Sequence, residues 1–329
     1  MKAKRVDALR HRLSRQGLDG VLIRVPEHVW WLSGDAPGHG AMLLVTMDRV
    51  LAVDRGHVID VIHGAGLAGA RLGCDDGTRS AGAVELADAR AALADARRAK
   101  DADEIAALEH AARVVDEALA ACRATAVAGA TGTEVFAAAS AALARAAGQA
   151  VQLEGNLGAG PAGDDPDAVP TDTPLREGEW LFVDLYPRVG GYYGDATRAF
   201  AIGRPTELAE RLHRVLWSAL DHAAEALRPG VAAGEIDARC RAVLEREGLE
   251  QHFPHHTGHG LGLQQQEPPM LVSGSPDPLR VGDVVTIEPG VYLPGVGGMR
   301  VEDVFVIETD GARRLTAAPR ALSMEVEHG

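Results

Sequence analysis

The sequence predicts an α+β protein: a small α/β unit followed by a larger domain whose helices lie on one side of an antiparallel sheet. The chain has 329 residues, which at roughly 150 residues per domain predicts two domains. In the second part, helix-like and strand-like segments do not alternate strictly, which favours α+β over a doubly wound parallel sheet. Aromatic residues make up only 4% of the chain, so the core is expected to consist mostly of alanine, valine and leucine.

The first 98 residues are predicted to form the α/β unit. Val6, Leu9 and Leu13 repeat at helical spacing, and Gly17 ends that helix. Three short apolar runs are typical of strands: 21–25, 41–46 and 50–53. We place the boundary near Arg98, which predicts domains over 1–98 and 99–329.

The second domain begins with helices and ends with strands. Thr131 and Glu134 have the spacing of a capping box, in which the hydroxyl caps free N–H groups and the carboxylate reaches back. Helices are predicted from residue 104 onward, from residue 131, over 207–227 and over 235–247. Strands are predicted over 180–183, 192–201, 284–287 and 301–307.

Charge and cysteine content exclude several classes of protein. Lysine and arginine sum to 33 and aspartate and glutamate to 47, so the net charge is −14, and we expect neither nucleic acid nor an anionic membrane as a partner. The three cysteines are far apart, which argues against a disulfide framework and favours a reducing compartment. With no apolar segment of a signal peptide or membrane span, a cytoplasmic protein is expected.

Four separated segments place a carboxylate or an imidazole in strand-like or glycine-rich sequence. Asp184 ends an apolar run, and Asp195 follows eleven residues later across a predicted hairpin near 189–191, which would bring both onto one face. His259 lies between glycines in 255–262, and Glu288 and Glu302 lie in apolar runs. Taken alone, each of these residues also fits a purely structural role. A carboxylate fits a turn residue or a charge at the end of a strand, and His259 fits a hydrogen-bonded structural histidine.

As a set, these residues predict a metal site. Four carboxylates and one imidazole in buried-looking sequence would be very unfavourable without positive charge. Two divalent cations would neutralise the four negative charges. A donor set rich in oxygen with one nitrogen favours Mn²⁺, Fe²⁺ or Co²⁺ over a thiolate-type zinc site.

The order Asp, Asp, His, Glu, Glu in these motifs resembles the pita-bread metallopeptidases, which include methionine aminopeptidase, aminopeptidase P and prolidase. The motifs GHGLGL at 258–263, TIEPGVY at 286–292 and MRVED at 299–303 carry this resemblance. Residues 18–23 and 31–34 are similar to pieces of the smaller N-terminal domain of aminopeptidase P and prolidase. The resemblance therefore covers nearly the whole chain and implies a pita-bread catalytic domain after a shortened creatinase-type N-terminal domain.

The resemblance also implies a role for each residue. Asp184 would bind one metal ion, Asp195 and Glu302 would bridge two, and His259 and Glu288 would complete the second. Two divalent ions are implied, most simply Mn²⁺, although Fe²⁺, Co²⁺ and Zn²⁺ suit the same ligands. A hydroxide bridging the two ions would attack an Xaa-Pro amide, and Glu288 would take the proton of its parent water.

Two further residues have roles suggested by their place in the family motifs. Arg300 would orient a carboxylate ligand, with a plain surface arginine as the alternative. His255 matches a family position that lines the substrate pocket.

Two positions depart from the family pattern. Gln266 stands where active members have a histidine seven residues after the metal-binding histidine, and Asp167 stands where they have one seventeen residues before the first metal-binding aspartate. Glutamine donates a neutral hydrogen bond but transfers no proton near neutral pH. Ionised Asp167 repels a developing oxyanion and attracts a cationic substrate group.

Three hypotheses follow for function. The first is hydrolysis of an Xaa-Pro bond in a dipeptide or short peptide, by a cytoplasmic homodimer as in relatives with an N-terminal domain. The second keeps the fold and the metals but acts on a small non-peptide substrate, as an amidinohydrolase or lyase, with Asp167 binding an ammonium or guanidinium group. The third is a pseudo-enzyme that binds partners, which the intact ligand set disfavours.

Overall fold

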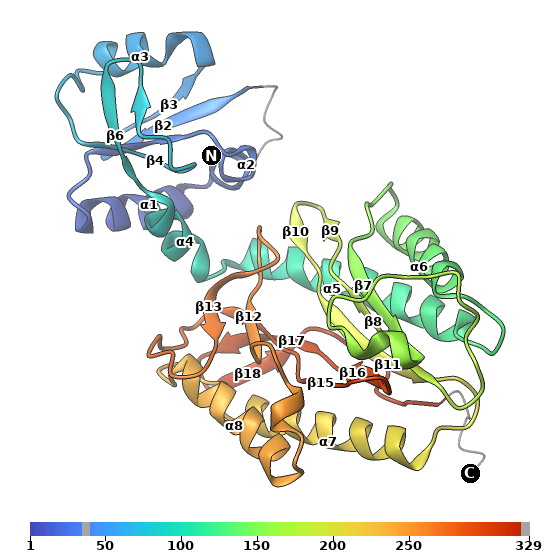
Figure 1. The fold of residues 1–329 in the computed structure, drawn as a ribbon. Coiled ribbons are helices and arrows are strands. Elements are labelled where there is room, and N and C mark those ends of the chain that lie inside the picture. Colours follow the sequence, from blue (N-terminus) through green and yellow to red (C-terminus); the bar gives the residue numbers. More distant parts are fainter. Residues whose placement is uncertain (35–39, 324–329) are drawn as a thin grey trace. The chain divides into compact units, whose positions relative to one another are not determined.

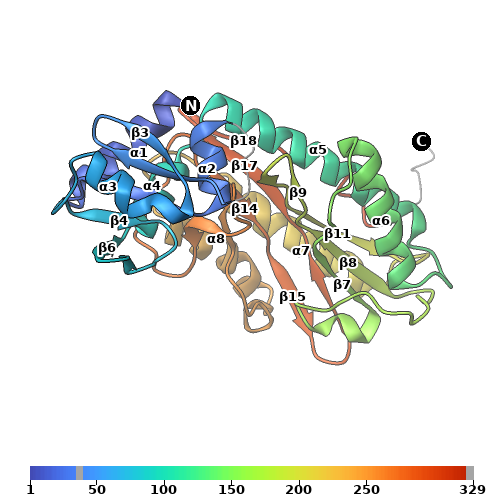
Figure 2. The same cartoon turned by 90° about the horizontal axis from the view of Figure 1, so that it is seen from above.

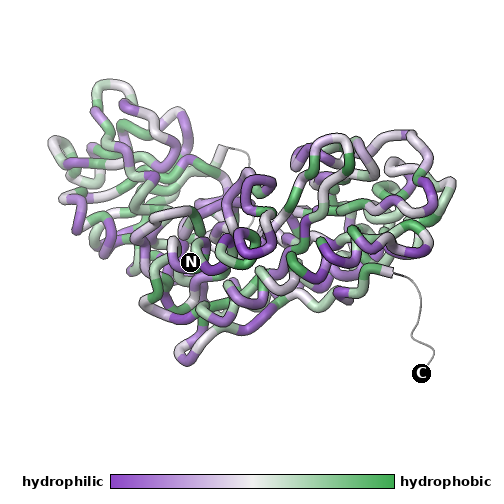
Figure 3. The backbone as a smooth tube through the Cα atoms, turned by 60° about the horizontal axis from the view of Figure 1, so that its bottom comes forward, coloured by the Kyte–Doolittle hydropathy of each residue, from purple (hydrophilic) through white to green (hydrophobic). Residues whose placement is uncertain are grey.

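The computed structural model describes residues 1–34 and 40–323 and divides into two compact units, 1–98 and 99–329 (Figure 1). In both units, apolar and polar stretches alternate along the chain (Figure 3). No helix within the described ranges is long and apolar enough to cross a membrane.

Within its described residues, the first unit is a mixed six-stranded sheet with four α-helices. Its strand order is β3-β2-β1-β4-β6-β5, with β1–β4 and β4–β6 parallel and the other pairs antiparallel. The helices are α1 (Ala3–Arg15), α2 (Pro26–Ser33), α3 (Val58–Gly64) and α4 (Arg90–Arg98). The strands are β1 (Gly20–Ile23), β2 (Met42–Thr46), β3 (Val50–Val53), β4 (Leu72–Cys74), β5 (Ser80–Ala81) and β6 (Val84–Asp88).

The second unit contains two larger antiparallel sheets, ordered β11-β8-β7 and β13-β12-β14-β17-β18, and two short hairpins, β9–β10 and β15–β16. Its helices are α5 (Ala102–Thr125), α6 (Gly132–Ala147), α7 (Glu207–Ala224) and α8 (Ala233–Arg246). The strands before α7 are β7 (Gly155–Ala159), β8 (Trp180–Leu185), β9 (Arg188–Val189), β10 (Tyr192–Tyr193) and β11 (Ala196–Ala201). The later strands are β12 (Gly258–Gly260), β13 (Glu267–Leu271), β14 (Val284–Ile287), β15 (Gly290–Leu293), β16 (Gly297–Arg300), β17 (Asp303–Glu308) and β18 (Gly311–Arg314).

Helices cover the sheets of the second unit in two pairs. α5 packs on α6 and on strands β8 to β11, and α7 packs on α8 and on strands β14 to β16 (Figure 2). Small side chains fill the core of the first pair, including Ala111, Ala118 and Ala139, which are all fully buried. Because alanine keeps helix axes close, this core needs few aromatic residues.

The structure confirms the predicted cap of α6. The Thr131 hydroxyl accepts the Glu134 N–H at 3.2 Å, and the Glu134 carboxylate accepts the Thr131 N–H at 2.8 Å. Two strand predictions were too long. The run 192–201 is divided between β10 and β11 at Gly194 and Asp195, and the run from residue 301 starts its strand at Asp303.

The three cysteines are free and buried, one in the first unit and two in the second. Burial raises the pKa of the Cys74 thiol to about 11. It raises the pKa values of Cys122 and Cys240 to about 12.

Candidate metal centre

The first two carboxylates are placed together by the pairing of β8 with β11. Asp184 lies opposite Thr197 in this antiparallel pair, and Asp195 precedes Thr197 by two residues. Side chains alternate along a strand and opposite residues share a face, so Asp184 and Asp195 point to the same side. The intervening hairpin turns at Gly190 and Gly191, whose φ angles of +57° and +91° favour glycine.

Glu302 joins this pair from another part of the chain. It lies between β16 and β17 rather than inside a strand. Its N–H donates to the Thr197 carbonyl at 3.1 Å, and the Thr197 hydroxyl donates to Glu302 Oε2 at 2.9 Å. These two bonds fix the carboxylate beside the β8–β11 face.

His259 and Glu288 come from β12 and the end of β14. The His259 N–H donates to Thr286 Oγ1 at 3.1 Å, and the Glu288 N–H donates to the Thr257 carbonyl at 2.8 Å. Gly258 allows this approach, because a Cβ there would lie 2.1 Å from the Thr286 carbonyl oxygen. The two strands thereby bring the imidazole against the carboxylate.

The His259 ring presents one nitrogen to the carboxylates. Its Nδ1 lies 3.0 Å from the Gly260 carbonyl, so Nδ1–H donates there and the Nε2 lone pair points the other way. Nε2 lies 3.3 Å from Glu288 Oε1 and 3.8 Å from Asp195 Oδ2. Burial lowers the pKa of His259 to about 4, which keeps the ring neutral at pH 7, as a metal ligand must be.

Arg300 supplies positive charge at one end of the cluster. Its Nη2 donates to Asp184 Oδ2 at 2.7 Å, and its guanidinium lies 5.1 Å from the centre of the Phe182 ring. The same nitrogen donates to the Pro166 carbonyl at 3.4 Å. Arg300 therefore orients Asp184 and ties the loop that contains Asp167 to the site.

One arginine does not balance the four carboxylates. Burial raises the pKa of each of these groups, and their mutual repulsion adds to the shift for Asp195, Glu288 and Glu302. The pKa of Glu288 rises to about 8. Protons or cations must therefore accompany the cluster at neutral pH.

The unmatched oxygens fit divalent ions. Among the described residues, one carboxylate oxygen on each of three residues is buried without a hydrogen-bond partner: Asp184 Oδ1, Asp195 Oδ2 and Glu302 Oε1. Asp195, His259 and Glu302 each offer a ligand atom within 4.8 Å of the others. Buried oxygens around one imidazole nitrogen form the donor set that Mn²⁺ or Fe²⁺ accepts.

The predicted pocket residues lie around this centre in different ways. His255 is half-buried, and its Nε2 lies 3.1 Å from the Tyr292 hydroxyl. Its pKa is lowered to about 3 by burial. Asp167 and Gln266 are exposed, so neither side chain is held by the core.

Sequence reasoning missed two residues that contact the cluster. His256 has its Nδ1 3.4 Å from Glu288 Oε1, and its position beside His255 was the only signal. Gln265 lies close enough to Asp195 to lower the pKa of that carboxyl, although the family pattern drew attention to its neighbour, Gln266.

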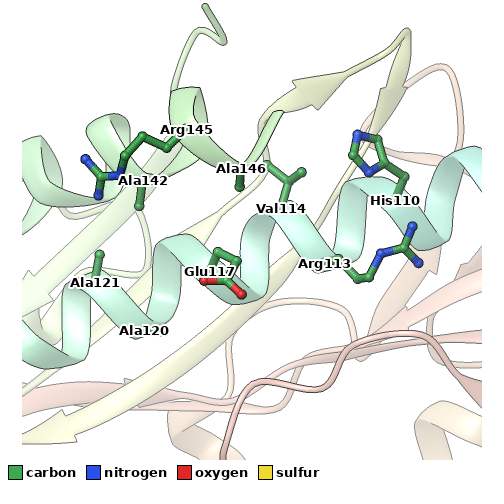
Figure 4. Close-up of a pocket in the computed structure, with 9 residues that line it drawn as sticks. All are labelled: His110, Arg113, Val114, Glu117, Ala120, Ala121, Ala142, Arg145 and Ala146. Carbon is green, nitrogen blue, oxygen red and sulfur yellow. The ribbon is translucent and has the colours of Figure 1, made fainter. Parts of the chain in front are cut away.

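A separate cavity of about 680 Å³ lies between α5 and α6 (Figure 4). Alanine side chains of the two helices face one another across it, and charged residues stand along its edges. Its lining is distinct from the five-residue cluster: His110, Arg113, Val114, Glu117, Ala120, Ala121, Ala142, Arg145 and Ala146.

Comparison with known proteins identifies the family. Residues 106–309 match metallopeptidase family M24, and residues 5–125 match the creatinase/prolidase N-terminal domain. The chain therefore belongs to the M24 family of metal-dependent hydrolases, as the motifs predicted, and that family implies divalent metal ions. The N-terminal match extends through α5, beyond the unit boundary at Arg98.

Individual relatives are dipeptidases by name. The chain is 28% identical to the Xaa-Pro dipeptidase of Pyrococcus furiosus over 97% of its length and 99% of that protein. It is 41% identical to the probable dipeptidase PepE of Mycobacterium tuberculosis, but that match covers 50% of this chain and 44% of that protein.

Solved structures confirm the predicted fold over both units. Dipeptidase PepE from Mycobacterium ulcerans superposes with a TM-score of 0.85 at 29% identity, covering 98% of this chain and 97% of that one. The prolidase from Pyrococcus horikoshii OT3 superposes with a TM-score of 0.87 at 26% identity, covering 97% and 99%. The second unit is thus a pita-bread domain.

Proposed function

We propose that this chain is a dinuclear-metal peptidase that hydrolyses Xaa-Pro bonds in dipeptides or short peptides. The observation that carries the proposal is the convergence of four buried carboxylates and one neutral imidazole, with three carboxylate oxygens left without partners. The names of the relatives, Xaa-Pro dipeptidase and prolidase, support the same substrate class.

Five residues would hold the two ions, which we take to be Mn²⁺: Asp184, Asp195, His259, Glu288 and Glu302. Lewis acidity and a lowered pKa for water are what divalent ions supply at such a site. The charges agree, since four carboxylates match two divalent cations. Arg300 then keeps Asp184 oriented and does not replace a cation.

The residues around the ions would bind substrate and move protons. Glu288 is the group we expect to accept a proton from water and return it to the leaving nitrogen, because its carboxylate faces both His256 and His259. His255, held by Tyr292, would contact the substrate.

A second candidate function rests on the two departures from the family pattern. Asp167 and Gln266 are exposed and replace groups that would donate a proton or a charged hydrogen bond. Asp167 follows Pro166, whose carbonyl contacts Arg300, so its negative charge is near the site. A small substrate with an ammonium or guanidinium group would be attracted there, and an amidinohydrolase or lyase reaction is the alternative.

Proline release and metal content test the proposal together. Protein purified with Mn²⁺ is incubated with a panel of Xaa-Pro dipeptides, and metal per chain is measured on the same sample. We expect two ions per chain and release of proline. Full metal loading without proline release under Mn²⁺, Co²⁺ or Fe²⁺ would favour the small-substrate function. A chain that takes up no metal would contradict both.

Assembly and location are further parts of the proposal. We infer a homodimer, which is what the family resemblance implies, and sedimentation of the full chain tests this. Free thiols at all three cysteines fit a reducing compartment, and we place the protein in the cytoplasm.

A further inference from the structure

Two residues on α8 outside the metal centre form hydrogen bonds to the segment 253–257, which contains His255 and His256. Asp237 and Arg241 are one helical turn apart, and Arg241 Nε donates to both oxygens of Asp237 at 3.2 and 3.0 Å. The Asp237 side chain is only 1% exposed. A carboxylate this buried is costly without a partner, and the partly buried Arg241, which is 25% exposed, supplies one.

The rest of the Arg241 guanidinium contacts the chain just before the metal-binding histidine. Nη2 donates to the His255 carbonyl at 2.7 Å, and Nη1 donates to the Phe253 carbonyl at 3.3 Å. The guanidinium also lies 4.5 Å from the centre of the Phe253 ring. That ring meets the His255 ring edge-on at 4.8 Å, so one cation fixes both the backbone and the ring contact of His255.

Asp237 fixes the other end of the same segment. The Thr257 hydroxyl donates to Asp237 Oδ1 at 2.8 Å. The Thr257 carbonyl in turn accepts the Glu288 N–H. The segment 253–257, with His255 and His256 inside it, is therefore held at both ends by a single pair of side chains.

We propose that Arg241 and Asp237 are positioning residues that set where His255 and His256 stand in the substrate pocket. Among the residues that the structure describes, neither forms a hydrogen bond or ion pair with the five-residue cluster; they act through the backbone of 253–257. This role rests on the proposed function, because the two histidines contact a substrate only if the chain is such a peptidase. Small displacements of such groups reduce rates by large factors.

The test compares two arginines on the same helix. Arg241→Met keeps the aliphatic stem and removes the donors. Arg239→Met is the matched control, because Arg239 also pairs with an acid one turn earlier, Glu235, but both side chains are substantially exposed. For each full-length variant, KM and kcat are measured with alanylproline under Mn²⁺, together with metal per chain. Histidine-labelled protein gives NMR signals for His255 and His256, assigned with single histidine-to-asparagine variants.

For Arg241→Met we expect kcat/KM to fall by about tenfold or more, mainly through a higher KM because the histidines line the substrate pocket, with unchanged metal content. The His255 and His256 signals should shift, and Arg239→Met should leave every measurement at the wild-type value. Wild-type kinetics and histidine signals in Arg241→Met would overturn the proposal. An equal loss in Arg239→Met would do the same.

A second variant decides the case if Arg241→Met does not fold. Arg241→Lys keeps the stem and the charge but lacks the planar fork that reaches two carbonyls and the carboxylates of Asp237 and Glu250 at once. It should change KM and the histidine signals in the same direction, and unchanged values would refute the positioning role. If the wild-type chain releases no proline from any dipeptide, the proposed function fails, while the histidine signals still decide whether Arg241 positions the segment.

Discussion

At the scale of single residues, the centre combines a neutral imidazole with carboxyl groups whose charges are unmatched. Burial lowers the pKa of His259 and raises that of Glu288, so both groups favour the uncharged form in the chain alone. Cations would reverse this preference for Glu288 and leave it unchanged for His259. Metal binding is therefore expected to release protons from the carboxyl groups and not from the ring.

Asp195→Asn should separate metal binding from folding. Asparagine keeps the shape of the side chain but removes the charge and one anionic ligand. We expect metal affinity to fall by at least the roughly 10- to 100-fold seen when supporting groups are lost, and peptidase activity to fall with it. Elemental analysis measures the metal content of the variant, and circular dichroism shows whether it is folded. Wild-type metal content in a folded variant would contradict the ligand assignment.

Restoring the two family histidines should raise peptidase activity. Asp167→His with Gln266→His changes two exposed positions, so stability should change by about 0.5 kcal/mol or less. A positioned acid–base group contributes about 10²- to 10⁴-fold, and we expect proline release to increase about tenfold or more. Rates measured at several pH values check this. A decrease for every dipeptide in the panel would mean that the present residues already suit a peptide.

At the scale of elements, the centre depends on how closely β12 approaches β14. Gly258→Ala would place a Cβ 2.1 Å from the Thr286 carbonyl oxygen, and backbone cannot move aside as a side chain does. We expect destabilisation of roughly 1–3 kcal/mol from overpacking and weaker metal binding, since His259 is the next residue. Urea unfolding measures the first effect and metal titration the second.

Gly64→Ala is the control for this prediction. Gly64 ends α3 in the first unit, and a Cβ there meets nothing within 4 Å. Stability should stay within about 0.5 kcal/mol of wild type. Equal destabilisation by both substitutions would show that close approach at Gly258 is not the cause.

Local sequence signals predicted the elements better than their ends. The cap at Thr131 depends on residues three apart, and the strand over 284–287 is a continuous run of β-branched residues, so both were predictable. Glu302 was placed within a strand, but its N–H bonds to Thr197, about a hundred residues away. Long-range contacts of this kind set strand ends.

At the scale of the whole molecule, removal of metal should change the pH dependence of stability. In the metal-free chain all four carboxyl groups have raised pKa values, to about 8 for Glu288. The folded chain then binds more protons than the unfolded chain, so this stability is present at low pH and is lost as the pH rises toward about 8. Cations bind the deprotonated ligands, so they should stabilise the folded chain most at the higher pH.

Thermal unfolding with EDTA and with Mn²⁺, from about pH 5 to about pH 8, measures this effect. The difference in Tm between the two samples should widen as the pH rises. A Tm difference that stays constant or narrows as the pH rises would mean that protons and metal ions do not compete for the carboxyl groups.

The three buried thiols can report the order in which parts of the chain unfold. Only a thiolate attacks a disulfide reagent such as Ellman's, and burial with raised pKa values suppresses it at each position. Cys74 belongs to the first unit, and Cys122 and Cys240 to the second. The order in which these sulfurs become modified during slow heating would therefore record which half of the protein loosens first.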